Sequence, residues 1–349
     1  MKFTCPSEAI IEALVPLATY VTSDIISLEL QGNELRISIS ARDVGGSVTL
    51  IVHGEESGEV DLPMSVVAFF KKMPEGRFVF ELIDSDPGDY VMMTCGKSKF
   101  KSATMRGGVV TRVDPPDPKA ERGRVKSSDI ARVSGAASPA SNTAWATGVY
   151  FDNDDGQAVL VATDSVSLAR INTLSPTPEP VIVPVEACRN VARVGGEWEV
   201  EVRSNVVLFV RDGFTFWTSV IKSSYPNYKF VIPDPDVLIT ADKKELLDAL
   251  SRLSISDDGQ TSVRLDFSYG SPIVMSLATS TSASREEVDI SSEPFDDFTT
   301  YFTVRGLTGA VKAAKADKLR IGWSGVGKPL TFGSDADDIT YIMQPIVKR

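Results

Sequence analysis

Few residues of this 349-residue chain stand in patterns that could carry chemistry. His53 is the only histidine, and it ends the expected strand 48–52 with no candidate nucleophile near it in sequence, so no histidine-assisted nucleophile is indicated. Residues 325–328 (Gly-Val-Gly-Lys) resemble the end of a phosphate-binding loop, but Pro329 stands where a serine or threonine would bind Mg²⁺. We interpret 325–328 as a hairpin turn and His53 as a surface residue.

Two further patterns could suggest metal binding, and both fail. Residues 152–156 (Asp-Asn-Asp-Asp-Gly) look like the start of a calcium loop, yet they join two expected strands, and the twelfth position is Thr163 rather than a glutamate. Cys5, Cys95 and Cys188 are odd in number and far apart, which fits neither a disulfide framework nor a zinc site. We expect no metal, no cofactor and no catalytic residue, and therefore a protein that is not an enzyme.

The composition is that of an ordinary globular protein, with 42% hydrophobic and 24% charged residues. The chain has no run of about 18 apolar residues, and unpaired cysteines are typical of a reducing compartment, so we expect a cytoplasmic protein with no membrane partner. The formal net charge of −11 argues against an ordinary nucleic-acid-binding domain, which would normally be basic. Any role on DNA must account for that charge.

Residues 180–203 show the pattern of elements around which the chain is organised. A β-branched run leads into Pro184, which suits the first turn of a helix because its missing N–H would be unpaired there. The expected helix ends at the glycines 195–196, after which apolar residues alternate with three glutamates up to Glu201. The pattern predicts a strand, a helix and a half-buried strand.

The same pattern begins again at Glu59 and at Thr299. Phe78, Trp198 and Leu319 occupy the same place in it, about 120 residues apart, and so long a period predicts a repeated domain rather than a solenoid. We expect an α+β protein of three similar domains, each with two helices and antiparallel sheets. The expected bounds are 1–113, 121–232 and 237–349 for the domains, and 114–120 and 233–236 for the linkers.

The expected helices differ in charge from the remainder of the chain. They are expected within residues 7–20, 65–77, 126–140, 184–196, 241–256 and 302–320. Counted together they are net positive, although the chain is acidic. In the last of them Arg305, Lys312 and Lys315 share one face. A basic helix face on an acidic body suits a polyanion that approaches from one direction, but lysines that merely solvate a helix would explain the count equally well.

Three stretches of the sequence resemble a known protein family in their residues and not only in their pattern. Residues 161–169, 224–233 and 341–346 resemble, in that order, signatures of the bacterial DNA polymerase III β subunit family, the β sliding clamps. Residues 1–3 and 96–100 are also similar to that family. The resemblance covers essentially the whole chain.

The chain departs from the family in residues that bear on which partner motifs it binds. Ser165, Val166 and Ser167 stand where the family usually has Gly-His-Arg, and Gln344 stands where it usually has Met. The resemblance therefore indicates a divergent member, either phage-encoded or a paralogue.

The resemblance implies a fold and a function. It implies three tandem DNA-clamp domains per subunit and a head-to-tail homodimeric ring whose helices line the hole. Such a ring holds duplex DNA topologically and without sequence preference, so a weakly positive inner face is enough and the acidic net charge is no obstacle. The implied function is a processivity factor that tethers a polymerase and a clamp loader through short peptide motifs. The alternative is a clamp-fold protein that does not load on DNA and sequesters such partners.

The resemblance also implies three sets of site residues. The partner-peptide pocket between the second and third domains would use Thr163, Leu168, Pro226, Val231, Ile342, Met343, Pro345 and Ile346. The ring interface would use Lys97, Lys99, Phe100 and Lys101 against Leu253, Ile255, Glu286, Glu287 and Asp289. DNA would contact Lys71, Lys72, Arg132, Trp145, Arg189, Arg193, Arg305, Lys312 and Lys315. Ordinary core residues and solvated lysines are the alternative explanations.

Overall fold

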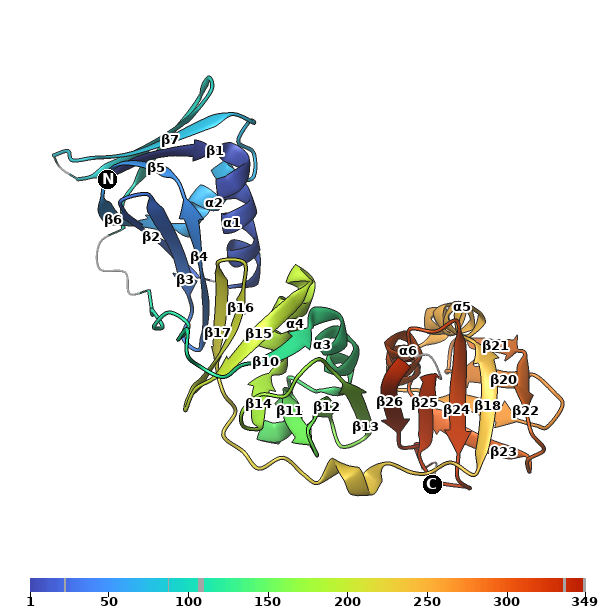
Figure 1. Ribbon diagram of the computed structural model, residues 1–349. Helices are drawn as coiled ribbons and strands as arrows, with labels where there is room; N and C mark the ends of the chain where they lie inside the picture. The colour runs from blue at the N-terminus through green and yellow to red at the C-terminus, as the bar shows by residue number, and fades with distance from the viewer. Residues whose placement is uncertain (22, 87, 106–109, 335–336, 348–349) are drawn as a thin grey trace. The chain divides into compact units, whose positions relative to one another are not determined.

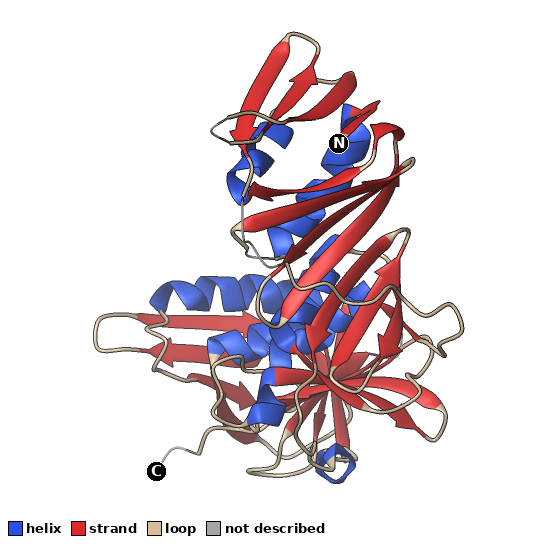
Figure 2. Cartoon of the chain, turned by 90° about the vertical axis from the view of Figure 1, so that its left-hand side faces the viewer, coloured by secondary structure: helices blue, strands red, loops and turns tan. Residues whose placement is uncertain are grey.

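The computed structural model describes residues 1–349 except 22, 87, 106–109, 335–336 and 348–349 (Figure 1). The described residues form six α-helices and four sheets, and strands make up most of the regular structure (Figure 2). They divide into two compact units, one with residues 1–124 and 193–220, the other with residues 125–192 and 221–349. The three expected domains and their bounds remain a prediction.

The first unit is built mainly from two sheets. Its elements are β1 (Lys2–Pro6), α1 (Ser7–Tyr20), β2 (Ile25–Gln31), β3 (Glu34–Ser40), β4 (Val44–Ile51), β5 (His53–Glu56), β6 (Gly58–Pro63), α2 (Val67–Phe70), β7 (Arg77–Ile83), β8 (Tyr90–Cys95), β9 (Ser98–Ala103), β15 (Glu197–Val202), β16 (Val206–Arg211) and β17 (Phe214–Ser219). With β10 (Gly123–Lys126), the strand orders are β5-β1-β7-β8-β9 and β10-β15-β16-β17-β4-β3-β2-β6.

The eight-stranded sheet joins strands that are far apart in the chain. Strand β17 pairs antiparallel with β4, with Trp217 opposite Gly45 and Phe216 opposite Gly46. A Cβ on Gly45 would lie 2.6 Å from the Trp217 indole, so only glycine fits beneath that ring. The side chain of Leu17, from α1, fills the corresponding space at Gly46. This contact places α1 against the sheet.

The second unit contains the other two sheets. Its elements are α3 (Ser127–Val133), β11 (Gly148–Asp154), β12 (Gln157–Thr163), β13 (Ser167–Asn172), β14 (Val181–Pro184), β18 (Val237–Asp242), α5 (Lys243–Leu253), β19 (Val263–Phe267), β20 (Ile273–Ala278), β21 (Ala283–Val288), β22 (Ile290–Ser292), β23 (Phe298–Phe302), α6 (Val304–Ala313), β24 (Lys318–Trp323), β25 (Leu330–Ser334) and β26 (Asp337–Met343). The strand orders are β14-β11-β12-β13-β26-β25-β24-β18-β22 and β21-β20-β19-β23.

The repeated strand–helix–strand pattern is confirmed. Phe78, Trp198 and Leu319 are each the second residue of the strand after the second helix, in β7, β15 and β24, and each is at most 1% exposed. The helices before them are α2, α4 (Val185–Val194) and α6. A buried side chain at one fixed place in three strands explains why the sequence repeats there.

In the sequence, Asp242 followed three residues later by Glu245 predicts the start of a helix, and Asp242 is the N-cap of α5. The Asp242 carboxylate accepts a hydrogen bond from the backbone N–H of Glu245 at 3.0 Å. Helix α6 begins in the same way, with the Thr303 hydroxyl accepting from the N–H of Gly306 at 3.1 Å. Each side-chain oxygen satisfies a donor that has no partner within its helix.

Three helices are shorter than the sequence suggested. Within 65–77 the α-helix covers only Val67–Phe70, because Pro74 disfavours a helical residue before it. Lys71 and Lys72 therefore lie beyond the helix. The helix expected at 126–140 ends at Val133.

The helix expected at 302–320 ends at Ala313, after which Ala314 takes an extended conformation (ψ 143°). Arg305 and Lys312 stay on α6, but Lys315 lies outside it. The expected three-residue basic face of this helix is thus wrong for its third member.

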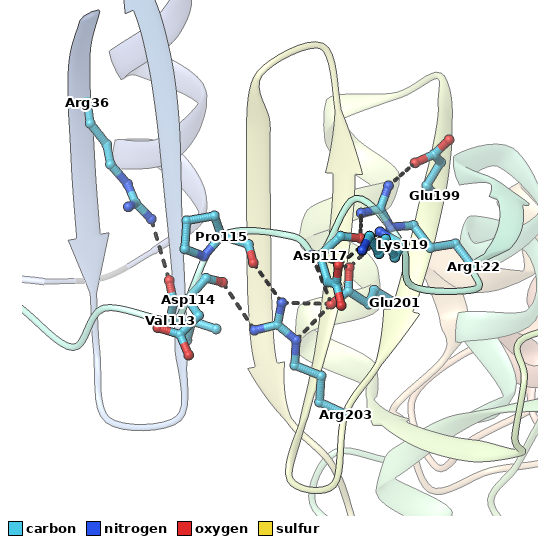
Figure 3. A network of polar contacts seen from close by, with 10 residues as sticks. All are labelled: Arg36, Val113, Asp114, Pro115, Asp117, Lys119, Arg122, Glu199, Glu201 and Arg203. Atoms are coloured by element: carbon cyan, nitrogen blue, oxygen red, sulfur yellow. Dashed lines mark hydrogen bonds and ion pairs between the residues drawn. The ribbon is translucent and has the colours of Figure 1, made fainter.

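Glu201 departs from the alternation expected along strand β15, because it is only 2% exposed. Figure 3 shows the polar contacts of its carboxylate. Its carboxylate accepts from Arg122 Nε at 3.1 Å and from the backbone N–H of Asp117 at 3.2 Å. An Arg203 Nη lies 2.7 Å from its other oxygen. A carboxylate can be buried here because it is paired and hydrogen-bonded on both oxygens.

The same arginines fix the backbone of the first linker. Arg203 donates to the carbonyl oxygens of Asp114 at 3.1 Å and Pro115 at 2.9 Å. Arg122 donates to the carbonyl oxygen of Asp117 at 2.7 Å. The linker is thus held to the eight-stranded sheet by polar contacts (Figure 3).

Among the described residues, none of the helices is both long and apolar enough to cross a membrane.

Candidate functional site

A cavity of about 190 Å³ opens on the nine-stranded sheet of the second unit. It is lined by Trp145, Thr163, Ser165, Val166, Ser167, Leu168, Pro226, Asn227, Tyr228, Val231, Ile342 and Gln344. These residues come from three separate segments of the chain, around β12 and β13, around 226–231, and around the end of β26. We call it the strand-end pocket.

Strand pairing brings the first and last segments together. Strands β13 and β26 run antiparallel, with Leu168 opposite Ile342. Beyond the last ladder pair, the backbone N–H of Gln344 donates to the carbonyl oxygen of Val166 at 2.9 Å. Directly opposite residues share a face of a sheet, so Leu168 and Ile342 form one apolar floor.

A tight turn after β12 shapes one wall of the pocket. The Asp164 carboxylate accepts from the backbone N–H groups of Val166 at 2.9 Å and Ser167 at 2.6 Å. The Thr163 hydroxyl donates to the carbonyl oxygen of Ser167 at 2.6 Å. Ser165 takes φ = 79°, a left-handed conformation that is costly for a residue with a side chain. The Asp164 carboxylate compensates this strain through its hydrogen bonds.

Aromatic rings form the opposite wall. Trp145 meets Tyr225 edge to face, with centroids 6.0 Å apart, and Tyr225 stacks on Tyr150 at 4.4 Å. Tyr228 is buried, and its hydroxyl donates to the Asp152 carboxylate at 2.9 Å. Burial, with a further contribution from Asp152, raises the pKa of Tyr228 well above its ordinary value. The wall is therefore neutral and fixed at ordinary pH.

Charge is kept beside the pocket rather than inside it. Asp154 accepts from Lys229 and, at 3.2 Å, from Arg170. The hydrogen bond from Lys229 is the largest cause that lowers the pKa of Asp154. Among the described lining residues there is no charged side chain, and amide and hydroxyl groups supply the polar atoms. Such a cavity suits the uncharged side chains of an extended segment.

Apolar surface remains exposed around the opening. Val166 is 53% exposed and Val231 is 51% exposed, although both line the pocket. Phe230, next to Val231 in the chain, is 87% exposed. Exposed apolar side chains clustered at a cavity are typical of a binding surface.

Five of the eight residues expected in the partner pocket line this cavity: Thr163, Leu168, Pro226, Val231 and Ile342. Met343 does not, because it lies on the other face of β26, where its side chain ends against Gly306 of α6. Pro345 and Ile346 lie beyond the lining, and Ile346 donates its N–H to the carbonyl oxygen of Tyr301 at 2.8 Å.

Sequence reasoning missed other lining residues, of which Trp145 is the largest. Trp145 was expected at DNA, but it lies in the pocket wall against Tyr225. Gln344 was noted only as a departure from the family, yet it lines the cavity. The alternation of side chains along β26 could have placed Gln344 with Ile342 and separated both from Met343.

The residues expected at DNA differ in their surroundings. Arg132 donates to the carbonyl oxygen of Ala313, and Lys315 lies 3.8 Å from Asp129. Arg189 pairs with Glu186 at 2.7 Å. The remaining residues of the set, Lys71, Lys72, Arg193, Arg305 and Lys312, are all exposed.

The strands expected at the ring interface are both sheet edges, β9 in the five-stranded sheet and β21 in the four-stranded one. Lys99 and Lys101 share the exposed face of β9, whereas Lys97 precedes the strand. Phe100 stacks on Phe69 of its own unit at 4.8 Å.

On the acidic side of the expected interface, Leu253 is a core residue and is unavailable to Phe100, while Ile255 is 84% exposed. Glu286 already pairs with Arg252 at 2.6 Å, and Glu287 pairs with Arg285 at 2.8 Å. Asp289 lies between β21 and β22.

In the part of the chain that the structure describes, no group of three or more histidine, cysteine, aspartate or glutamate side chains could hold a metal ion.

Several known proteins are similar to this chain in sequence and in fold. No family model matches the chain. The "Beta sliding clamp" of Staphylococcus aureus is 23% identical over 371 residues, which cover 96% of this chain and 94% of that protein. The crystal structure of the DNA polymerase sliding clamp from Pseudomonas aeruginosa superimposes with a TM-score of 0.87 at 21% identity, and that from Bacillus subtilis with 0.87 at 19%, each covering 100% of both chains.

The fold is therefore that of a bacterial DNA polymerase sliding clamp. Its sequence also aligns with curated β sliding clamps over nearly its full length.

Proposed function

We propose that this protein is a DNA sliding clamp, a processivity factor that encircles duplex DNA and tethers a polymerase and a clamp loader. The observation that carries the proposal is the strand-end pocket, an uncharged cavity with exposed apolar surface around it, in a chain whose fold matches sliding clamps over its whole length. The proposed protein acts by binding and has no chemistry of its own. Its proposed location is the cytoplasm, where bacterial DNA is replicated.

The proposed ring is a homodimer closed by edge pairing of β9 on β21 of the partner subunit. Both strands are sheet edges, and unpaired edge groups invite such pairing. The exposed Ile255 would supply apolar contact, and Lys99 and Lys101 would face the acidic strand. Exposed ion pairs contribute little each, about 0–1 kcal/mol, so apolar burial should dominate.

Retention on DNA tests the clamp function. The protein is loaded with a clamp loader on nicked circular DNA, and half of the sample is then linearised. Retention on circles at raised salt, with release from linear DNA, is the expected result, since escape from a circle requires opening of the protein ring. Equal loss from both forms would contradict the topological function. Partner binding without any retention would support the alternative, a protein that sequesters clamp partners.

A matched pair of variants tests the partner site. Val231→Asp places a charge in the strand-end pocket, whereas Val326→Asp places one at a valine that is 82% exposed in a turn outside the lining. Fluorescence anisotropy with a synthetic clamp-binding peptide of a replicative polymerase should show at least a tenfold loss of affinity for Val231→Asp alone. Equal affinities would refute the pocket assignment.

A substitution at Ile255 tests the proposed ring interface. Ile255→Asp should give monomers in sedimentation velocity at micromolar concentration, and Val326→Asp should stay dimeric as the unmodified chain. A dimeric Ile255→Asp protein would exclude Ile255 from the interface.

A further inference from the structure

One carboxylate is held beside the strand-end pocket by the turn after β12. Asp164 stands between Thr163 and Ser165 in the chain, and both of these residues line the pocket. Its carboxylate accepts hydrogen bonds from the backbone N–H groups of Val166 at 2.9 Å and Ser167 at 2.6 Å, which also line the pocket. The turn therefore fixes a negative charge next to the lining.

A second carboxylate lies behind the aromatic wall. Tyr228 lines the pocket with only 4% of its surface exposed, and its hydroxyl donates to Asp152 at 2.9 Å. The backbone N–H of Asn153 donates to the same carboxyl group at 2.9 Å. After burial, the hydrogen bond to Asp152 and the charge of Asp152 are the largest causes that raise the pKa of Tyr228. The charge of Asp152 thus acts on a side chain of the pocket wall.

The groups that hold these two carboxylates carry no charge of their own. Backbone N–H groups and a tyrosine hydroxyl satisfy hydrogen bonds but do not offset a negative charge. The turn itself adds no cation, because Asp164 is followed by Ser165, Val166 and Ser167. Asp152 and Asp164 are both half-buried, so water and salt screen their charges less than at an exposed position.

Two cations beside the pocket share a third carboxylate. Lys229 and Arg170 both donate to Asp154. Of these five groups, three are carboxylates (Asp152, Asp154 and Asp164) and two are cations, so one negative charge is in excess. The walls of the pocket are uncharged, but the field of the groups behind them is negative.

A bound segment would meet this field at the opening of the pocket. Val166 connects the two, because its N–H contacts Asp164 and its side chain is 53% exposed at the opening. The uncharged lining suits an apolar anchor side chain, and the residues on either side of the anchor then cross the opening. Extended chain advances about 3.3–3.6 Å per residue, and the Debye length at physiological salt is about 8 Å. The residues next to the anchor therefore lie within the range of the field.

We propose that the strand-end pocket selects partner segments whose apolar anchor is flanked by lysine or arginine, and that it discriminates against segments flanked by aspartate or glutamate. Asp164 and Asp152 are the specificity-determining residues. They attract a basic flank and repel an acidic one, and repulsion of the wrong partner is a common source of specificity. The inference rests on the proposed function of this pocket as a partner site.

Fluorescence anisotropy with three peptides tests the proposal. The peptides share the clamp-binding sequence of a replicative polymerase and differ only next to its apolar anchor, where they carry lysine, glutamine or glutamate. At low salt the lysine peptide should bind about tenfold or more tighter than the glutamate peptide, with the glutamine peptide between them. The difference should shrink at about 0.5 M salt, because counterions screen the field.

Asp164→Asn locates the origin of the preference, because it removes one charge and keeps a side-chain oxygen that can accept from the same two N–H groups. It should narrow the ratio of the lysine and glutamate affinities about threefold. The matched control is Asp258→Asn. The Asp258 carboxylate also accepts from the N–H groups two and three residues on, those of Gln260 at 2.9 Å and Thr261 at 2.7 Å, but it lies outside the lining.

Asp152→Asn is a second variant that does not depend on the turn. The Tyr228 hydroxyl can accept a hydrogen bond from the new amide as readily as it donates to the present carboxylate. The affinity ratio should narrow here as well. Because a ratio of two peptides is compared, a loss of affinity common to both peptides does not affect the result.

A preference for lysine that Asp164→Asn narrows and Asp258→Asn leaves unchanged would support the proposal. Equal affinities for the three peptides, or tighter binding of the glutamate peptide, would overturn it and leave the partner site intact. Equal narrowing by both variants would also overturn it, since that would reveal general attraction of basic peptides to an acidic protein. Failure of all three peptides to bind would overturn it together with the proposed partner site.

Discussion

The two segments that attach to the large sheets without joining them as strands are held by opposite means. Residues 114–120 are held by charge, through the buried Glu201 and the guanidinium groups of Arg122 and Arg203. Residues 225–232 are held by rings and aliphatic side chains, with Tyr228 packed in the core that contains Val159 and Val161.

This difference follows from what each segment can offer. The first contains three prolines and few large apolar side chains, so its backbone carbonyl groups are the available attachment points, and arginines supply the matching donors. The second brings two tyrosines and an isoleucine, which can bury area without regard to direction. One attachment is therefore directional and sensitive to charge, and the other depends on packing.

The largest expected effect is on the packed segment. Tyr228→Ala should lower the free energy of unfolding of the second unit by about 3–5 kcal/mol, because it empties a buried aromatic site. Hydrogen exchange should increase in β12 and β13 and stay unchanged in β15 and β16. Urea denaturation gives the magnitude. Faster exchange in both sets of strands would show that the two attachments are not independent.

Removing the central charge of the other segment should cost somewhat less. Glu201→Gln should destabilise the first unit by about 3 kcal/mol, since two arginines lose their shared buried partner. Glu199→Gln is the control, because Glu199 also pairs with Arg122 but is half exposed, and its change should stay below about 1 kcal/mol. If urea denaturation gives the same loss of unfolding free energy for Glu201→Gln and Glu199→Gln, the burial of Glu201 contributes nothing to stability.

A smaller change separates packing from hydrogen bonding in the second segment. Tyr228→Phe keeps the ring and removes only the hydrogen bond to Asp152, so about 1.5 kcal/mol should be lost. Tyr269→Phe, at a tyrosine that is 52% exposed, should be neutral. A Tyr228→Phe variant as unstable as Tyr228→Ala would mean that the hydroxyl, and not the ring, holds the segment.

The smallest effect is acid dependence at the edge of the packed segment. Lys229, and then Arg170, lower the pKa of Asp154 below its ordinary value of 3.8. A carboxyl with a lowered folded-state pKa stabilises the fold above its ordinary pKa and ceases to do so as the pH falls through the lowered value. The difference in the free energy of unfolding between the unmodified chain and Asp154→Asn should thus be constant above about pH 5 and vanish in stronger acid.

This difference in the free energy of unfolding should stay below about 1 kcal/mol, because Lys229 is half exposed and solvent screens its pair with Asp154. Equilibrium unfolding at a series of pH values measures it. A difference that persists unchanged at the lowest pH values would show that the stabilisation does not come from ionisation of Asp154.

The sequence predicted local features well and distant contacts poorly. The strand–helix–strand units, the α5 cap and the shared place of Phe78, Trp198 and Leu319 depend on neighbouring residues or on a repeat, and both kinds of signal are visible in the sequence. The burial of Glu201 was not predictable, because its partners are about 80 residues away in the chain, Asp117 in the first linker and Arg122 just after it.

The candidate pocket shows the same limit. Within the three signature stretches, five of the eight predicted residues line the cavity, whereas Met343, Pro345 and Ile346 do not. Alternation along a strand would have excluded Met343. Trp145 was placed by resemblance alone, and its contact with Tyr225 joins residues that no local pattern connects. Helix lengths were overestimated where a proline or an extended residue ends the helix, which removed Lys71, Lys72 and Lys315 from the helical faces.

The large sheets also decide where this chain can be cut. Strand β4 is paired with β17, and β13 is paired with β26, so each hydrogen-bond ladder continues past a linker. A fragment that ends at residue 113 would leave β4 without its neighbour, and one that ends at 232 would do the same to β13. Bare strand edges recruit other chains. Single-domain fragments cut at the linkers should therefore aggregate, and stable fragments will need cuts that keep both members of each pair.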